Sequence, residues 1–315
     1  MKLQINLQKD FRELMMEKIS QLIELGFEFQ SYDSWKEKNG DYYDKYEIEQ
    51  LVAYANLRQK IPEEMPRNVL KCNTFICPDK YKIYVNELEQ KIINGEPLFP
   101  YLSRKIMKPL FCDKMLYDFG ITHFHLGNKK SKKNELLIEG SKDLLFAFME
   151  GDNCYFIEIN THGKFDDENF LEKLKASFPE VLKKWEIGDV KSINCISNDD
   201  RKKLKKMCVN TPLEMNGKYY APFGGGMSVI GTSPLAHHEM AKKYLYFDDL
   251  ELNLKYFLRN KKMELENNLK IKIEEMVLQM VDVEPIKVID KINKIEMYVK
   301  IEGQKLYVEY SMYTK

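Results

Sequence analysis

Apolar residues recur at three- and four-residue spacing over much of the first hundred positions, which is the pattern of helices with one buried face. Between Lys9 and Leu25 this spacing predicts a helix that ends at Gly26. The same spacing predicts helices from Tyr46 to Lys60 and from Pro78 to Asn94, where a proline suits the first helical turn. Residues 1–105 are therefore predicted to form a helical region that acts as a scaffold or lid.

The period falls to two in the middle of the chain, which indicates strands with one face buried. Three runs show this alternation: GITHFHL (120–126), DLLFAFME (143–150) and NCYFIEIN (153–160). Gly151-Asp152 joins the second and third runs and predicts a tight hairpin. Helical spacing returns over residues 165–185. Residues 106–207 are thus predicted to form a small antiparallel sheet core with a helix.

The C-terminal region, residues 208–315, mixes both periods. Asn216-Gly217 predicts a hairpin turn, and Ser233-Pro234 suits the N-cap and first position of a helical stretch over 234–281. Glu302-Gly303 then joins two alternating runs, which predicts a terminal β-meander. The predicted fold class of the chain is α+β, in three successive regions.

Composition narrows the classes of function. The chain of 315 residues carries 49 basic and 49 acidic residues, so affinity for nucleic acid has to come from a local patch. The first ten residues include charged side chains and lack an apolar segment. The sequence contains no apolar run of 18 residues. The six cysteines are scattered and are expected to be reduced thiols. We therefore expect a cytoplasmic protein with no membrane partner.

Histidines concentrate around the predicted sheet. On the first strand, alternation places His123 and His125 on one face, about 7 Å apart by the strand repeat. If the third strand extends by two residues, His162 joins Glu158 on one face of it. The residues predicted to share that face are Cys154, Phe156, Glu158 and Asn160. In a suitable register, three imidazoles and a carboxylate converge over the sheet.

The order of these elements resembles a known family. LYDFGITHFHLG, a lysine-rich loop and SKDLLFAFMEGDNCYFIEINTHGKF are similar to the RelE/ParE-like toxin core over about 50 of the 315 residues. The resemblance implies a helix on a small antiparallel sheet whose exposed face cleaves RNA, within the barnase, EndoU and RelE group of ribonucleases, which generally need no metal. There is no arginine between Arg104 and Arg201, although RelE-type sites commonly use arginines to neutralise phosphate. The histidine-rich site looks closer to the EndoU style.

These residues suit acid–base cleavage of RNA. A neutral histidine takes the proton of a ribose 2′-OH, the alkoxide attacks phosphorus, and a protonated histidine gives a proton to the departing 5′-oxygen. The candidates are His125 and His162, with His123 as the alternate and Glu158 beside them, while Lys164 stabilises the phosphorane charge. The predicted RNA-binding residues are Lys129, Lys130, Lys132 and Lys133.

The leading interpretation is a metal-independent endoribonuclease of toxin or antiviral-defence type, with RNA as substrate, no cofactor and a neutralising protein such as an antitoxin as a partner. Two alternatives stay open. His123, His125 and His162 also suit a three-imidazole zinc site in a metal-dependent hydrolase. The chain can also be a non-catalytic binding protein on the same fold, as the missing arginines would permit.

A glycine-rich segment at 224–231 is the other unusual feature. Gly226-x4-Gly231-Thr232 looks like a phosphate-binding loop only superficially, since threonine stands where the lysine should follow. A structural turn before a helix explains it, although free amides at the helix start can accept an RNA phosphate. The second-tier site residues are Gly225, Gly226, His238 and Glu239.

Overall fold

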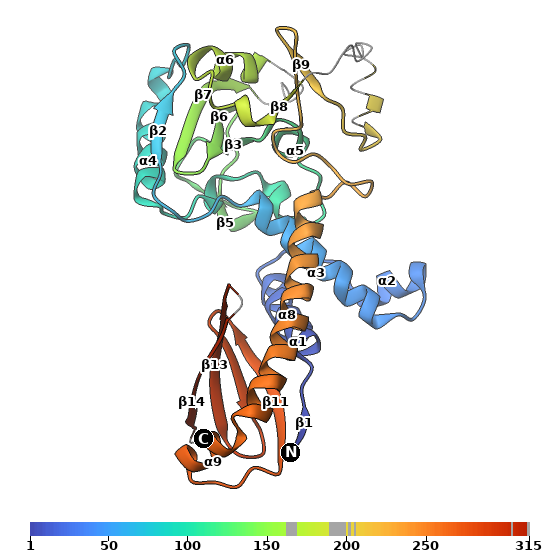
Figure 1. The fold of residues 1–315 in the computed structure, drawn as a ribbon. Coiled ribbons are helices and arrows are strands. Elements are labelled where there is room, and N and C mark those ends of the chain that lie inside the picture. The colour runs from blue at the N-terminus through green and yellow to red at the C-terminus, as the bar shows by residue number, and fades with distance from the viewer. Residues whose placement is uncertain (162–168, 189–199, 201–202, 205, 304, 314–315) are drawn as a thin grey trace. The chain divides into compact units, whose positions relative to one another are not determined.

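The computed structural model describes residues 1–161, 169–188, 200, 203–204, 206–303 and 305–313. The chain forms two compact units, one of residues 1–52 and 237–315 and the other of residues 53–236. Both combine helices and strands, which confirms the α+β class (Figure 1). The division expected from the sequence, with boundaries after residues 105 and 207, differs from these units, because both boundaries fall inside the second unit.

The first unit is built on a five-stranded sheet in the order β1-β11-β12-β13-β14. Its strands are β1 (Lys2–Gln4), β11 (Glu275–Val283), β12 (Ile286–Asp290), β13 (Ile295–Glu302) and β14 (Lys305–Met312). β11 to β14 pair with antiparallel neighbours, while β1 adds to β11 in parallel. The predicted C-terminal meander is therefore confirmed, and Gly303 takes a positive φ of 61° where β13 turns into β14.

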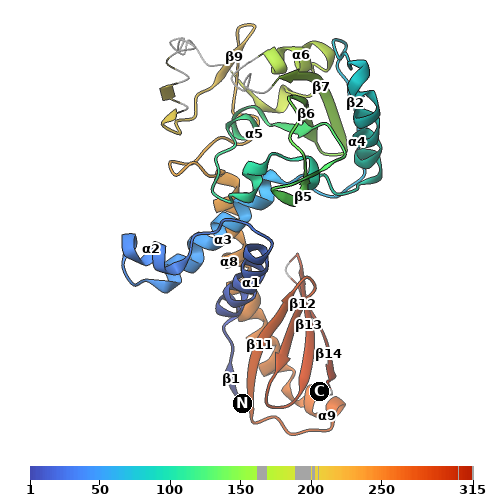
Figure 2. The ribbon, with the colours of Figure 1, turned by 180° about the vertical axis from the view of Figure 1, so that it is seen from behind.

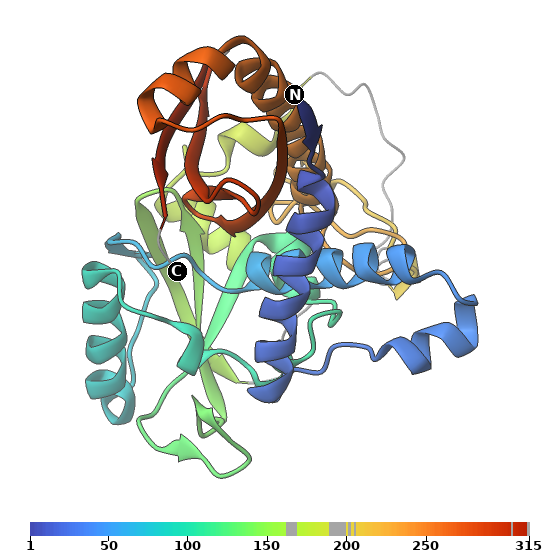
Figure 3. The same cartoon turned by 90° about the horizontal axis from the view of Figure 1, so that it is seen from below.

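Helices α1 (Leu7–Glu24), α2 (Tyr32–Asn39) and α9 (Lys262–Leu269) belong to this unit, as does most of α8 (Pro234–Asn260). Asn6 caps α1 by accepting from the Lys9 amide at 3.0 Å. Figure 3 shows α8 and α9 beside the curved meander. The predicted helical stretch ends earlier than residue 281, because residues 275–283 pair with β12 instead.

The second unit is built on a four-stranded sheet in the order β2-β7-β6-β3. Its strands are β2 (Asn68–Lys71), β3 (Ile121–His125), β6 (Asp143–Glu150) and β7 (Asn153–Thr161). The three predicted strands are confirmed as antiparallel neighbours, and Gly151 adopts a positive φ of 54° in the predicted hairpin turn. β2 pairs in parallel with β7 and brings part of the N-terminal region into this sheet. α4 (Lys82–Asn94) lies alongside β2 (Figure 2).

A β-bulge in β7 corrects the predicted arrangement of its side chains. Phe156 pairs with Ala147 and Glu158 pairs with Phe146, so Ile157 is an extra residue between two pairs. Because an extra residue reverses the alternation, Phe156 and Glu158 point to opposite faces. The prediction that Cys154, Phe156, Glu158 and Asn160 share one face is therefore wrong.

The face of the sheet that carries the histidines of β3 packs against α6 (Asn169–Ser177). Phe146, the partner of His123 in the register, stacks on Phe170 of α6 with ring centroids 4.5 Å apart. Leu171 and Leu174 extend the same core. The predicted helix over 165–185 is shorter in the structure because helical hydrogen bonding ends near Ser177.

Further elements belong wholly or partly to the second unit. The helix α3 (Tyr43–Lys60) crosses from one unit to the other, and α5 (Lys114–Phe119) leads into β3. Asn216-Gly217 forms the predicted two-residue hairpin turn. The short strands are β4 (Lys130–Ser131), β5 (Asn134–Ile138), β8 (Glu186–Ile187), β9 (Leu213–Met215) and β10 (Lys218–Tyr220). The 3-10 helices are η1 (Asp79–Tyr81), η2 (Phe99–Tyr101), η3 (Arg104–Met107) and η4 (Lys183–Trp185).

Candidate functional site

A cavity of about 340 Å³ lies in the second unit, beside the edge strand β3. Thr122 and His123 alternate on this strand, and both line the cavity because, among the described residues, no further strand covers the edge. The opposite walls come from η3 and from the segment before α5. Ile106 and Phe111 supply apolar surface there. A cavity with mostly apolar walls and a few polar groups is the usual form of a small-ligand site.

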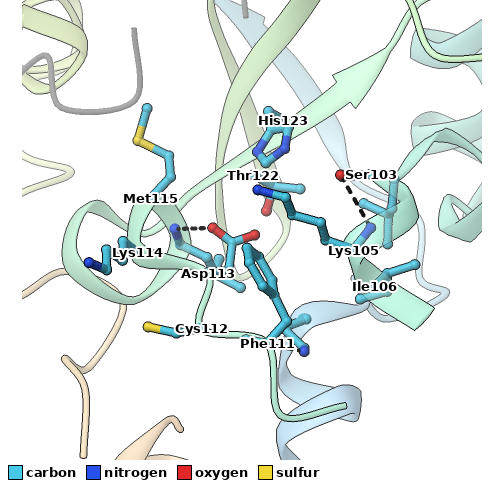
Figure 4. A pocket seen from close by; sticks show the side chains of 13 residues that line it. Ser103, Lys105, Ile106, Phe111, Cys112, Asp113, Lys114, Met115, Thr122 and His123 are labelled. Atoms are coloured by element: carbon cyan, nitrogen blue, oxygen red, sulfur yellow. Dashed lines mark hydrogen bonds between the residues drawn. The ribbon is translucent and has the colours of Figure 1, made fainter. Parts of the chain in front are cut away.

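Asp113 enters the cavity because it caps α5. Its carboxylate accepts a hydrogen bond from the Leu116 amide at 3.1 Å, which satisfies one of the free amides at the start of the helix. Figure 4 shows the second carboxylate oxygen of Asp113 on the cavity side. The cap thus fixes a negative charge at the cavity wall.

Lys105 extends into the cavity from η3. Figure 4 shows its side chain reaching toward Thr122 and His123. Its ammonium lies 4.8 Å from the centre of the Phe111 ring, a distance that permits a cation–π interaction. A positive charge, an imidazole and an aromatic surface therefore face the same space.

Lys60 holds the backbone of the cavity wall in place. Its buried ammonium donates to the carbonyl oxygens of Lys108, Pro109 and Phe111 at 3.0, 2.9 and 3.2 Å. Burial lowers the pKa of Lys60 to about 8. One turn earlier, the buried Asn56 side chain also donates to the Pro109 carbonyl, at 2.7 Å. The last turns of α3 therefore hold the chain that carries Phe111 into the cavity.

Cys112 also lines the cavity but is a poor nucleophile there. Burial raises the pKa of its thiol to about 11. Since the thiolate is the reactive form, the side chain is protonated and unreactive at neutral pH. Its sulfur packs 3.4 Å from the sulfur of Met227.

The two histidines of β3 have different environments. His123 is half-buried, lines the cavity and lies 6.2 Å from the Phe146 ring, measured between ring centres. His125 is buried, and its Nδ1 accepts from the Ser141 amide at 3.0 Å. In the neutral ring that bond places the proton of His125 on Nε2. His125 therefore anchors the chain before β6, while His123 faces the cavity.

The other predicted catalytic residues are not brought to this cavity by the described structure. Glu158 forms an ion pair with Lys173 of α6 and accepts from the side-chain Nδ2 of Asn160 at 2.8 Å. β6 separates Glu158 from His123, which puts their backbones about 10 Å apart by the spacing of strands. His162 and Lys164 lie outside the described residues, so the convergence of three imidazoles stays a prediction.

The predicted RNA-binding lysines lie on the small β4–β5 hairpin and its flanks. All four side chains are exposed: Lys129, Lys130, Lys132 and Lys133. They do not line the cavity.

The glycine-rich segment packs on α5. The amide of Gly226 donates to the Tyr117 carbonyl at 2.8 Å, and a Cβ on Gly224 would lie 1.7 Å from the Leu116 carbonyl oxygen. Gly225 and Gly226 belong to the second unit, whereas His238 and Glu239 lie in the part of α8 that belongs to the first. Pro234 is the first residue of α8, as the sequence predicts.

Sequence reasoning missed Lys60, Lys105 and Asp113. Asp113 had a recognisable signal, because an aspartate directly before a helical run is a frequent N-cap. The two lysines had none, since a lysine in a region predicted to be a helical scaffold is usually solvated.

Within the described ranges, no cluster of three or more histidine, cysteine, aspartate or glutamate side chains is arranged to hold a metal ion. The predicted zinc set includes His162, which is outside those ranges. In the same part of the chain, every helix is too short or too polar to cross a bilayer. No protein-family model, curated protein or solved structure matches this chain.

Proposed function

We propose that the second unit is an endoribonuclease whose active site is the cavity beside β3. The observation that carries the proposal is that His123, Lys105 and Asp113 line one cavity together with the Phe111 ring. The antiparallel order of β3, β6 and β7 with α6 on one face is the arrangement implied by the resemblance to RelE/ParE-like toxins. From that resemblance we propose the toxin or antiviral-defence type, with a neutralising protein as partner.

In the proposed reaction, RNA is cleaved by its own 2′-hydroxyl without a metal. His123 in its neutral form takes the 2′-OH proton, and the oxygen attacks the adjacent phosphorus. The ammonium of Lys105 stabilises the charge that develops on the phosphorane. A nucleobase of the RNA can stack on the ring of Phe111. His162 stays the predicted acid for the departing 5′-oxygen.

We propose His123 as the general base in place of His125. His125 accepts a backbone hydrogen bond through Nδ1 and is buried. A proton acceptor has to reach the substrate directly or through one water. His123 meets this requirement for a ligand in the cavity, since its side chain lines it.

The test is to incubate the purified protein with total RNA, with and without EDTA, and to analyse the new ends for a 2′,3′-cyclic phosphate. We expect cleavage that EDTA does not change, and a loss of at least about 100-fold in His123→Ala and in Lys105→Ala, the usual range for a removed acid–base group or oxyanion partner. Lys108→Ala is the matched control, because its side chain is exposed and lies outside the cavity.

The alternatives give different results. Cleavage that EDTA abolishes would support the zinc-dependent hydrolase instead. RNA binding without cleavage would support the non-catalytic protein. Cleavage that survives both cavity substitutions would contradict the placement of the active site.

A further inference from the structure

Helix α8 presents a second apolar stripe that the first unit does not cover. Leu245, Leu252 and Tyr256 are 70%, 68% and 71% exposed, respectively. Single exposed apolar residues are ordinary, but three large ones along one helix face indicate an interaction surface. With Asp249 and Arg259, which are also exposed, they repeat at alternating four- and three-residue spacing.

This spacing is that of heptad positions a and d, which form the seam of a coiled coil. The buried stripe of the same helix consists of Phe247, Leu250, Leu254 and Leu258, which belong to the core. The exposed stripe thus lies on the other side of a helix that is already held in place. We call these five exposed residues, from Leu245 to Arg259, the α8 seam.

We propose that the α8 seam binds the same seam of a second copy of the chain, with the two helices antiparallel about a two-fold axis that crosses the seam at the level of Leu254. In that arrangement, Leu252 of one copy lies level with Tyr256 of the other, since each is two residues from Leu254. Asp249 and Arg259 are each five residues from the axis and face one another. A two-fold interface requires this kind of self-complementarity, because every contact occurs twice.

Charge complementarity favours a second copy over another partner. Among the residues that the structure describes, neither the Asp249 carboxylate nor the Arg259 guanidinium has an ion-pair partner. The antiparallel arrangement gives each of these two groups an ion-pair partner in the other copy, and the two-fold axis repeats the pair. A parallel arrangement would instead place each charge opposite the same charge of the other copy. Opposite charges across a seam fix both the partner and the orientation.

The length of the seam sets the expected strength. The positions that face one another run from Asp249 to Arg259, about one and a half heptads, because Leu245 lies level with position 263, beyond the end of α8 at Asn260. So short a contact is expected to give a reversible dimer with a dissociation constant in the micromolar range.

Sedimentation equilibrium of the full chain tests the proposal. Over about 5 to 500 µM, a range that brackets a micromolar dissociation constant, we expect the mass to rise from 37.4 kDa toward twice that value. Leu252→Asp should weaken association by at least about 30-fold, because the residue lies next to the axis and is changed twice per dimer. Ile83→Asp on α4 is the matched control, since this side chain is also exposed, at 61%.

Charge exchange makes the test specific for this geometry. Asp249→Arg alone and Arg259→Asp alone should each weaken self-association, because like charges then meet twice. An equimolar mixture of the two variants should form a heterodimer, since every facing pair is again opposite. Circular dichroism of each variant confirms that it is folded.

A chain that stays monomeric over the whole range would overturn the proposal, as would a dimer that Leu252→Asp leaves unchanged or a mixture that fails to restore association. None of these results depends on RNA cleavage. The proposed function and the proposed dimer therefore stand or fall separately.

Discussion

Lys60 illustrates how a single buried charge can organise a site. Its ammonium donates to three backbone carbonyl oxygens of the segment 108–111 before α5, yet burial lowers its pKa from 10.5 to about 8. Between these two pH values the unfolded chain holds a proton on Lys60 that the folded chain has lost. The contribution of Lys60 to the free energy of unfolding therefore rises with pH in this window, and its full cost is present below about pH 8.

We predict that Lys60→Met removes this pH dependence. The free energy of unfolding of the wild type, minus that of the variant, should rise by up to about 3 kcal/mol from pH 8 to pH 10.5. Urea unfolding at several pH values measures the difference. Lys108→Met, an exposed neighbour, should show a constant difference. A constant difference for Lys60→Met as well would mean that the folded chain keeps the lysine protonated throughout.

The two histidines of β3 also differ in their individual environments. Alternation along β3 correctly groups the two side chains on one face, as the register confirms. The alternation does not reveal that His125 is buried and hydrogen-bonded to Ser141, whereas His123 lines a cavity. That distinction depends on the elements packed around each ring, which lie elsewhere in the sequence.

At the scale of elements, the glycine-rich segment packs closely on α5, whose residues Lys114, Met115 and Leu116 line the cavity. Gly224 approaches the backbone of α5 so closely that a side chain there would overlap the Leu116 carbonyl. The main-chain bond from Gly226 to Tyr117 and the bond from Phe223 to Asp118 tie the two segments together. Glycine is needed here for close approach between backbones.

Gly224→Ala should therefore destabilise the second unit by about 2 kcal/mol or more, in the upper range for overpacked sites. Gly127→Ala is the matched control, because a Cβ on Gly127 meets nothing within 4 Å. Its effect should stay within about 0.5 kcal/mol. Chemical denaturation followed by tryptophan fluorescence measures both variants. Equal stability of the two would refute the packing argument.

The elements also show where sequence patterns work. The hairpin turns at Gly151, Gly217 and Gly303 are correct because a two-residue turn with positive φ is encoded locally. The bulge at Ile157 was not predicted. The bulge changes which face of the sheet the following residues point to, and the order of residue types along the sequence does not show this change. The short β2 was missed, since its pairing partner β7 lies far along the chain.

At the scale of the whole molecule, the chain leaves and returns to its first unit. Residues 1–52 and 237–315 share one core, and residues 53–236 form another. Asp10 of α1 accepts a hydrogen bond from the Met280 amide of β11 at 2.9 Å, which joins the two ends of the chain within the first unit. Each unit has the buried apolar residues to unfold as its own cooperative block.

Hydrogen exchange read by mass spectrometry tests this independence. Phe146→Ala should cost about 3–5 kcal/mol and reduce protection in β6 and β7, while β12 and β13 keep theirs. Leu254→Ala should cost about 2–5 kcal/mol and do the reverse. Both side chains are fully buried, at 0% exposure. Loss of protection in both units with either variant would show that they unfold together.

Periodicity and turn residues by themselves determined the α+β class, most helices, the β3, β6 and β7 strands and the C-terminal meander, because these features depend on neighbours within a few positions. Only the tertiary structure decided which polar residues meet. Lys60, Lys105, Asp113 and His123 come from α3, η3, the α5 cap and β3, and no local pattern links them. A cavity depends on how separate elements pack, so its lining is a property of long-range contacts.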